Sequence, residues 1–336
     1  MIDPPRHGEG DQDAKRLGGG APAKSESSAA SSSPTGIEIA SAADSSVAPP
    51  LPHRPDGRWS PSPSGGGSFL VVTADDFGAD EAVNEAVETA HRDGVLTAAS
   101  LMVAGSAAAD AVARAQRLPR LGVGLHLVLV EGRPALPPEQ VPDLVDDSGH
   151  FRTNMALAGL KVAISPAARR QLAAEIEAQF AAFAATGLPL DHVNAHKHFH
   201  VHPVIGGLVI DAARRHGARA IRAPIEPGRP HGSARLAIAF ARRLRARAAR
   251  AGLIAPTRVF GLADSGRMDT DRTLAALAGV SNGLNELYLH PAVRDDWAGH
   301  APGYRYRAEF DALVAPAVRE AVTASGARLG CFADFA

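Results

Sequence analysis

The amino-acid sequence predicts an α/β fold, an irregular barrel of about seven or eight mostly parallel strands alternating with helices. Two observations lead to this prediction. From residue 69 onward, short apolar runs alternate with amphipathic segments, which is the pattern of βα units around a parallel sheet. Polar residues recur where several of these apolar runs end, and in a parallel barrel that edge carries the active site.

The chain divides by composition into two parts. Residues 1–67 are rich in Ser, Pro, Gly and Ala, so we expect a disordered segment with nothing to bury. It contains no apolar run long enough for a signal peptide or a membrane span, and we expect a cytoplasmic protein. Residues 68–336 then form one barrel domain. The formal net charge of -1 gives no general attraction to nucleic acid, which we do not expect as a partner, and a homodimer is left open.

Each predicted strand is a short apolar run that ends at polar, Gly or Pro residues. The first lies in FLVVTADDFG, residues 69–78, and stops at Asp75 and Asp76. The third, GVGLHLVLV, is interrupted by one polar residue, His126. The predicted strands cover 69–72, 97–103, 122–130, 190–193, 218–222, 284–290 and 328–332.

The predicted helices have apolar residues three and four positions apart, so that one face can pack on the sheet. The segment 80–92 shows this spacing and ends before Gly94, a suitable residue for a helix C-terminus. The predicted helices cover 80–92, 107–118, 171–186, 203–216 and 307–325.

Five polar residues fall in or just beyond the C-terminal part of a predicted strand. They are Asp75, Asp76, His126, His196 and His290. Taken singly, an Asp at a strand end is also explained as a helix N-cap, and a lone histidine in an apolar strand as a hydrogen-bonded core residue. Together, one Asp and two His make a ligand set that leaves coordination positions open for water and substrate, as in a hydrolytic metal centre.

Four histidines follow the predicted strand 190–193 at alternate positions, and in an extended segment they would share one face. They are His196, His198, His200 and His202. One ion cannot bind all four and still leave room for substrate, so His196, the first after the strand, is the best ligand. We assign His198 and His200, with Arg222 at the end of a predicted strand, to substrate binding, and His202 to structure. A histidine-rich surface tract is the alternative.

The motifs TADDFG, GLHLVL, NAHKHFH and YLHP, in this order, resemble the YdjC/ChbG family of carbohydrate deacetylases over about residues 69–335. Within that family, HRDGVLTAASLMVAG, GLHLVLVEGRP and LPLDHVNAHKHFHVHP resemble the hopanoid-biosynthesis-associated HpnK branch. The resemblance implies a barrel-like fold of the glycoside hydrolase/deacetylase type and hydrolysis of an N-acetyl group on a sugar.

Motif position then implies a role for each candidate residue. Asp76, His126 and His196 fall on the family's metal ligands, Asp75 on the general base and His290 on a C-terminal active-site histidine. The implied cofactor is one divalent metal ion, zinc or magnesium, and a mixed nitrogen and oxygen ligand set suits zinc, iron or cobalt better than magnesium. Oligosaccharide-acting members usually have DSH where this chain has NAH ending at His196, a departure that bears on the substrate and not on the metal.

An arginine-rich stretch follows the histidines. Residues 227–263 contain eight arginines and no acidic residue, and Leu236, Phe240 and Leu244 share a face of the helix expected there. A basic amphipathic helix can lie on an anionic membrane surface, so we expect peripheral contact with the inner membrane through residues 232–251. A solvated surface helix packed by the same apolar face is an equal alternative, and an RNA-binding face is a weaker one.

The sequence therefore predicts a metal-dependent hydrolase that removes the N-acetyl group from an N-acetylglucosamine-type sugar on a glycosylated hopanoid lipid. The alternatives are a deacetylase of soluble chito-oligosaccharides, a metal-dependent phosphoesterase and a barrel that binds sugar or lipid without catalysis.

Overall fold

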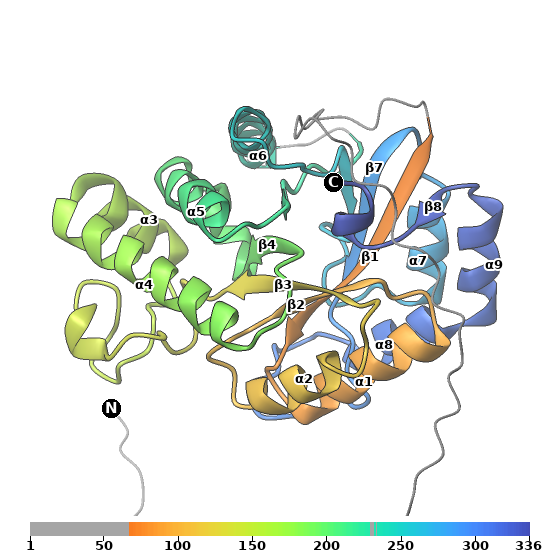
Figure 1. Cartoon of the computed structure of the whole chain (residues 1–336), viewed down its shortest axis with the longest axis horizontal. Helices are drawn as coiled ribbons and strands as arrows, with labels where there is room; N and C mark the ends of the chain where they lie inside the picture. Colours follow the sequence, from red (N-terminus) through yellow and green to blue (C-terminus); the bar gives the residue numbers. More distant parts are fainter. Residues whose placement is uncertain (1–66, 229–231, 233) are drawn as a thin grey trace, which may run out of the picture. The chain divides into compact units, whose positions relative to one another are not determined.

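A computed structural model describes residues 67–228, 232 and 234–336. The predicted disordered segment 1–67 lies outside this range except for Gly67. Within the described residues, eight strands form one sheet (Figure 1). They are β1 (Ser68–Phe77), β2 (Ala98–Leu101), β3 (Gly122–Leu127), β4 (His192–Ala195), β5 (Ala220–Ile221), β6 (Arg258–Phe260), β7 (Gly283–Leu289) and β8 (Arg328–Leu329).

The sheet is parallel and curled, in the order β5-β4-β3-β2-β1-β7-β6, with β8 paired to β1. Its longest pairing joins β1 to β7 in continuous register from Ser68 opposite Gly283 to Ala74 opposite Leu289. The two end strands, β5 and β6, do not pair with each other in the described part of the chain, so the barrel is open on that side. The predicted irregular parallel βα barrel is confirmed.

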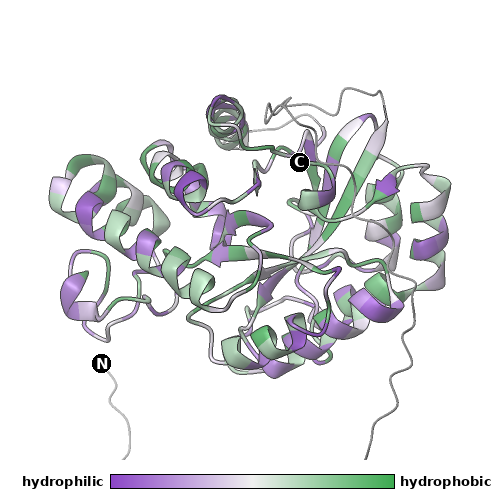
Figure 2. Ribbon diagram, in the orientation of Figure 1, coloured by the Kyte–Doolittle hydropathy of each residue, from purple (hydrophilic) through white to green (hydrophobic). Residues whose placement is uncertain are grey.

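Nine α-helices are formed by the described residues, and hydrophilic and hydrophobic residues are mixed along them (Figure 2). They are α1 (Glu81–Asp93), α2 (Ala108–Ala115), α3 (Met155–Ile164), α4 (Pro166–Ala185), α5 (Pro203–Arg215), α6 (Ala234–Arg250), α7 (Thr270–Leu277), α8 (Tyr306–Val314) and α9 (Pro316–Ala324). The described residues also form three 3₁₀ turns: η1 (Pro138–Gln140), η2 (His196–Val201) and η3 (Phe332–Asp334). None of the described helices has the length and apolar composition needed to cross a bilayer.

The core lies between the sheet and its helices. Leu70, Val71 and Val72 of β1 are fully buried, which explains the unbroken apolar run in a strand covered on both faces. Helix α1 packs its predicted apolar face on the sheet, and Asp80 caps it by accepting a hydrogen bond from the backbone N–H of Ala82 at 2.8 Å.

The structure differs from the sequence prediction at several elements. The single helix expected over 307–325 is wrong, because Ala315 is extended and Pro316 begins a second helix. Strand β6 was not predicted, since its three residues are too short a run to stand out. Helix α3 was not predicted either, because its sequence, MALAGLKVAI, is apolar on most sides and lacks a clear period.

Candidate metal centre and active site

The site lies at the C-terminal edge of the sheet, where neighbouring strands end. Asp75 and Asp76 are near the end of β1, His126 is in β3, and His196 directly follows β4. Consecutive residues in a strand point to opposite faces, but the β1 register with β2 is irregular here and Asp76 has a φ of 62°. This local turn lets both carboxylates face the same site.

Asp76, His126 and His196 bring one potential ligand atom each to a common position. His126 Nε2 and His196 Nδ1 lie 3.2 and 3.3 Å from Asp76 Oδ1, and all three atoms are within 4.8 Å of one another. Buried Oδ1 of Asp76 and Nε2 of His126 have no hydrogen-bond partner among the described residues. Buried polar atoms are rarely left unpaired, and a carboxylate with two imidazoles fits a divalent ion such as zinc.

The charges around these atoms also favour a cation. Among the described residues, Asp75, Asp76 and Glu286 are buried carboxylates, and the buried Arg222 guanidinium pairs with Asp75 and Glu286, so carboxylates outnumber guanidinium groups here. Burial lowers the pKa of His126, but the carboxylates of Asp75 and Asp76 outweigh it and raise that pKa above its usual value. A bound cation would offset the same excess of negative charge.

Asn194 of β4 orients the ligand His126. The Nδ1–H of His126 donates to Asn194 Oδ1 at 2.7 Å, which leaves Nε2 as the free lone pair. The Asn194 amide then donates to Asp75 Oδ1 at 3.1 Å and to Ser100 Oγ at 2.9 Å. No role was predicted for Asn194, which stood out only as a departure from a motif, although an amide two positions before the candidate ligand His196 was a signal for this role.

Asp75 is held by a bidentate ion pair with Arg222. Arg222 Nη1 and Nη2 lie 2.5 and 3.0 Å from the two carboxylate oxygens, and Nη2 also bonds to Glu286 Oε1 at 2.7 Å. Burial raises the pKa of the Asp75 carboxyl, but the Arg222 guanidinium outweighs burial and holds that pKa well below its usual range. Glu286 was not predicted, although a glutamate inside the apolar strand 284–290 is itself an unusual feature.

Arg222 is fully buried, and its guanidinium lies over the Tyr288 ring with 4.5 Å between Cζ and the ring centre. The assignment of Arg222 to substrate binding stays a prediction. Its burial favours a role in holding the Asp75 carboxylate in place.

His198 and His290 contribute to an aromatic wall beside Asp75. His198 Nε2 lies 3.2 Å from the Tyr288 hydroxyl, and the His290 ring lies 5.5 Å from that of Tyr288 and 5.2 Å from that of Tyr304. Burial, together with the charge of Arg222, holds the pKa of His198 well below its usual value, so its ring is neutral at pH 7.

The His290 side chain is 11% exposed, and its Nδ1 lies 3.9 Å from buried Glu309 Oε2. His290 is therefore partly open to a bound molecule, and its buried Nδ1 has no hydrogen-bond partner among the described residues.

The histidines after His196 do not lie on one face of an extended segment, and that expectation is wrong. Residues 196–201 form η2, in which Lys197 and His198 have φ values of 53° and 55°. His200 is fully buried, and its Nε2–H donates to the Arg222 carbonyl oxygen at 2.7 Å. The assignment of His200 to substrate binding stays a prediction. This hydrogen bond favours a role in positioning the backbone of Arg222. His202 is partly buried at the N-terminus of α5.

Comparison with known proteins places the chain in a family. A family model described as YdjC-like protein matches residues 69–324. The chain belongs to the YdjC-like family. The match spans β1 to α9, so it contains all the site residues described above.

Two curated relatives of this YdjC-like chain are carbohydrate deacetylases. The protein from Brevibacillus brevis is 42% identical over 147 residues, which cover 44% of this chain and 56% of that protein. The protein from Thermoanaerobacter pseudethanolicus is 26% identical over 244 residues, 72% of this chain and 88% of that one. The chain thus spans little more than half the length of the first relative.

A solved structure shares the fold of this YdjC-like chain. It is a protein from Enterococcus faecalis V583, provisionally described as a cellobiose-phosphate cleavage protein, with a TM-score of 0.63 and 22% identity. The match covers 80% of this chain and 98% of that protein. At this identity the likeness supports the fold alone.

Proposed function

We propose that this YdjC-like protein is a metal-dependent N-deacetylase acting on an N-acetylglucosamine-type sugar. The observation that carries the proposal is the meeting of the unpaired Asp76 Oδ1 and His126 Nε2 with His196 Nδ1, directly beside the buried carboxylate of Asp75. The two relatives named carbohydrate deacetylases support the same reaction.

Asp76, His126 and His196 would hold one divalent ion. Such an ion polarises an amide carbonyl and lowers the pKa of water from about 15.7 toward neutrality. The ligand set of one carboxylate and two imidazoles suits zinc better than magnesium, which prefers oxygen.

Asp75 and His290 move the protons in the proposed reaction. Asp75 is an unprotonated carboxylate placed to accept a proton from the attacking water, and its pairing with Arg222, which lowers its pKa, makes it a weaker base than a free aspartate. Arg222 and the Asn194 amide fix the carboxylate in place from two sides. His290 gives a proton to the departing amine, which is a poor leaving group as an anion, and the buried carboxylate of Glu309 lies 3.9 Å from His290 Nδ1.

A phosphoesterase is the less favoured enzyme. A phosphate substrate calls for free Arg or Lys side chains near the metal. Arg222 is neutralised by Asp75 and Glu286, and Lys197 forms an ion pair with Glu131. Measuring acetate and phosphate release from an N-acetylglucosaminide and a sugar phosphate, with zinc supplied, separates these reactions, and release of neither would favour a barrel that only binds.

We propose further that the sugar is carried by a lipid, a glycosylated hopanoid, in keeping with the motifs of the HpnK branch. Helix α3 supports an apolar aglycone, because Leu157, Leu160 and Ile164 form a stripe on one face with exposed fractions of 62%, 55% and 70%. No acidic residue occurs in 148–174, and Arg152 and Arg170 flank the stripe. An apolar stripe with basic flanks suits an anionic membrane surface.

Helix α3 is also close to the metal site. A β-carbon at Gly159 would lie 3.3 Å from His202 Cδ2 and 3.6 Å from Phe199 Cε2, so α3 packs on η2, which begins with His196. A lipid held at α3 could therefore present its sugar to the site while its apolar part stays at the bilayer.

Within residues 232–251, only exposed side chains can take part in the proposed membrane contact. Leu236 is 59% exposed, and Arg242 and Arg243 are exposed. Arg247 instead donates to the Pro203 carbonyl at 2.7 Å and packs over Gly207, so it joins α6 to α5.

The test of the lipid-linked substrate compares acetate release from an N-acetylglucosaminyl hopanoid in vesicles with release from soluble chito-oligosaccharides. Faster release from the soluble substrate would favour the alternative enzyme.

A further inference from the structure

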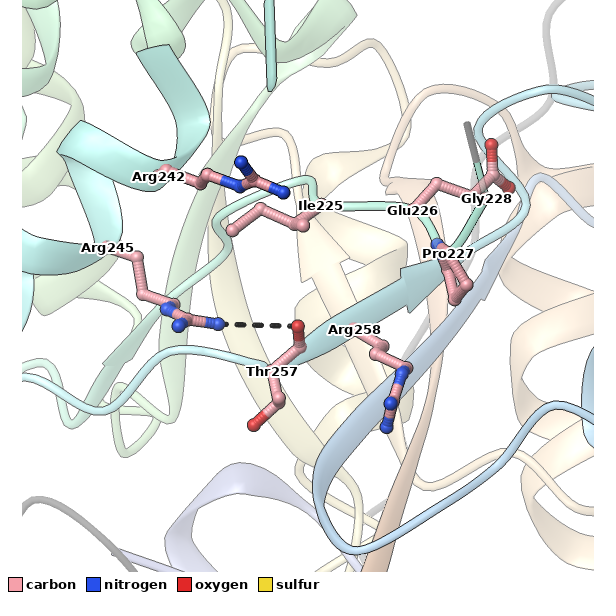
Figure 3. A pocket seen from close by; sticks show the side chains of 8 residues that line it. All are labelled: Ile225, Glu226, Pro227, Gly228, Arg242, Arg245, Thr257 and Arg258. Atoms are coloured by element: carbon pink, nitrogen blue, oxygen red, sulfur yellow. Dashed lines mark hydrogen bonds between the residues drawn. The ribbon is translucent and has the colours of Figure 1, made fainter. Parts of the chain in front are cut away.

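A cavity lined by arginines lies on the open side of the barrel, apart from the metal centre. Its volume is about 530 Å³ (Figure 3). Residues 225–228, which follow β5, form one wall, Arg242 and Arg245 of α6 form another, and Thr257 and Arg258 at the start of β6 complete it. The cavity is therefore lined from both sides of the gap between β5 and β6.

The three arginines of this cavity have no acidic partner in the part of the chain that the structure describes. Other arginines, such as Arg114 and Arg272, are paired with carboxylates. Arg245 Nη1 donates only to the Thr257 carbonyl, at 3.4 Å, which turns its guanidinium into the cavity (Figure 3). The remaining N–H donors of the three guanidinium groups are available to a ligand.

The one carboxylate in the lining, Glu226, is already used by the backbone. It accepts hydrogen bonds from the N–H groups of Gly261, Leu262 and Ala263 at 3.2, 3.0 and 2.9 Å. Figure 3 shows its side chain directed away from Arg242 and Arg245. Glu226 thus shapes the loop without neutralising the arginines, and the cavity keeps an excess of positive charge.

We infer that this cavity binds a phosphate group, held by the guanidinium groups of Arg242, Arg245 and Arg258. Arginine pairs with phosphate through two parallel N–H···O bonds, and Arg242 and Arg245, three residues apart on a helix, lie on one face. The volume leaves room for a phosphate with an attached group. The phosphate can belong to a soluble phosphorylated molecule or to a lipid headgroup, since the recognised chemistry is the same.

The direct test measures binding of pyrophosphate to the full chain by calorimetry at constant ionic strength. We expect the Arg242→Gln, Arg245→Gln double variant to bind at least about tenfold more weakly, because each lost guanidinium removes charge-assisted hydrogen bonds. The matched control is Arg243→Gln, Arg250→Gln, which removes two exposed arginines of α6 outside the cavity. Equal loss in both variants, or no binding by the wild-type chain, would overturn the inference.

Vesicle sedimentation separates the two sources of phosphate. Binding to phosphatidic acid vesicles that pyrophosphate displaces and that the double variant loses assigns a lipid headgroup. If the wild-type chain binds pyrophosphate, and the double variant and its matched control bind vesicles equally well, the ligand is a soluble phosphorylated molecule.

Arginine modification of the wild-type chain by phenylglyoxal gives a readout that does not depend on a variant folding. Pyrophosphate should protect Arg242, Arg245 and Arg258 but not Arg243 or Arg250. Equal protection of all five arginines, or protection of none, would contradict a phosphate site in this cavity. Acetate release from a soluble N-acetylglucosaminide should be unchanged in the double variant, since these arginines do not contact the metal centre.

Discussion

His126 donates from Nδ1 to Asn194 Oδ1 at 2.7 Å, and this bond turns Nε2 toward Asp76 with its lone pair free. Asn194→Ala removes the acceptor, so the imidazole can rotate or change tautomer. We expect metal affinity to fall by about 10–100-fold, the usual effect of losing such a partner. Competition with a metal chelator measures the change.

Asn194→Asp provides the informative comparison. It keeps an acceptor for His126 but can no longer donate to Asp75, and it adds a negative charge there. Metal affinity should be retained while turnover falls. If Asn194→Ala and Asn194→Asp lower metal affinity equally, the hydrogen bond between His126 and residue 194 does not orient the His126 imidazole.

The metal site itself is tested by the double variant Asp76→Ala, His126→Ala. Two of the three converging ligand atoms are removed, so elemental analysis of the purified protein should find no stoichiometric zinc or other divalent metal. The matched control is His300→Ala, an exposed histidine outside the cluster. A double variant that keeps one metal per chain would place the ion elsewhere.

Asp75→Asn separates proton transfer from metal binding. Asparagine preserves the shape of the side chain but cannot accept the proton of water, so turnover should fall by about 10²–10⁴-fold with the metal retained. The rate and the metal content are measured on the same preparation, with Asp271→Asn, an exposed residue of α7, as the control. A rate near that of the wild type would show that another group accepts the proton.

Arg222→Lys tests whether this arginine binds substrate or holds Asp75. Lysine keeps the charge but cannot reproduce the bidentate pair with Asp75 together with the bonds to Glu286. We expect kcat and thermal stability to fall, the latter because buried hydrogen-bond acceptors on the two carboxylates lose their donors, while KM changes little. A large rise in KM at unchanged kcat would instead support the substrate-binding assignment.

The triple variant Leu157→Ser, Leu160→Ser, Ile164→Ser tests the apolar stripe of α3. These side chains are already exposed, so thermal stability should change little, but binding to vesicles and acetate release from the lipid-linked sugar should both fall. Release from a soluble N-acetylglucosaminide should be unchanged, and Ala156→Ser is the control on the same helix. An equal loss on both substrates would mean that the stripe is structural.

Much of the fold could be predicted because its signals are local. The buried run of β1 and the apolar spacing of α1 each follow from a few neighbouring residues, and both are confirmed. The meeting of Asp76, His126 and His196 could be anticipated for a related reason, since strand ends of a parallel sheet share one edge. Short β6 carries a weaker local signal and was missed, and the break before Pro316 was missed although a proline within a helical run is itself a local signal of a helix boundary.

The partners of Asp75 could not be predicted in the same way. The bonds from Arg222 and Asn194 join residues 147 and 119 positions away in the sequence, and they depend on the register of three strands. The left-handed φ values within η2, which packs against α5 and α6, likewise have no signal in the spacing of its residues.

Lys197 and Glu131 pair across the rim, and both have positive φ values, 53° and 48°. Glycine at either position would adopt the same left-handed conformation without the steric cost of about 1–2 kcal/mol that other residues have there. Directed evolution for heat resistance alone would therefore enrich glycine at these positions and release the link between the loops that follow His126 and His196. Selection for thermostability should therefore also measure activity after heating, because these stabilising substitutions lie in the loops that follow two of the proposed metal ligands.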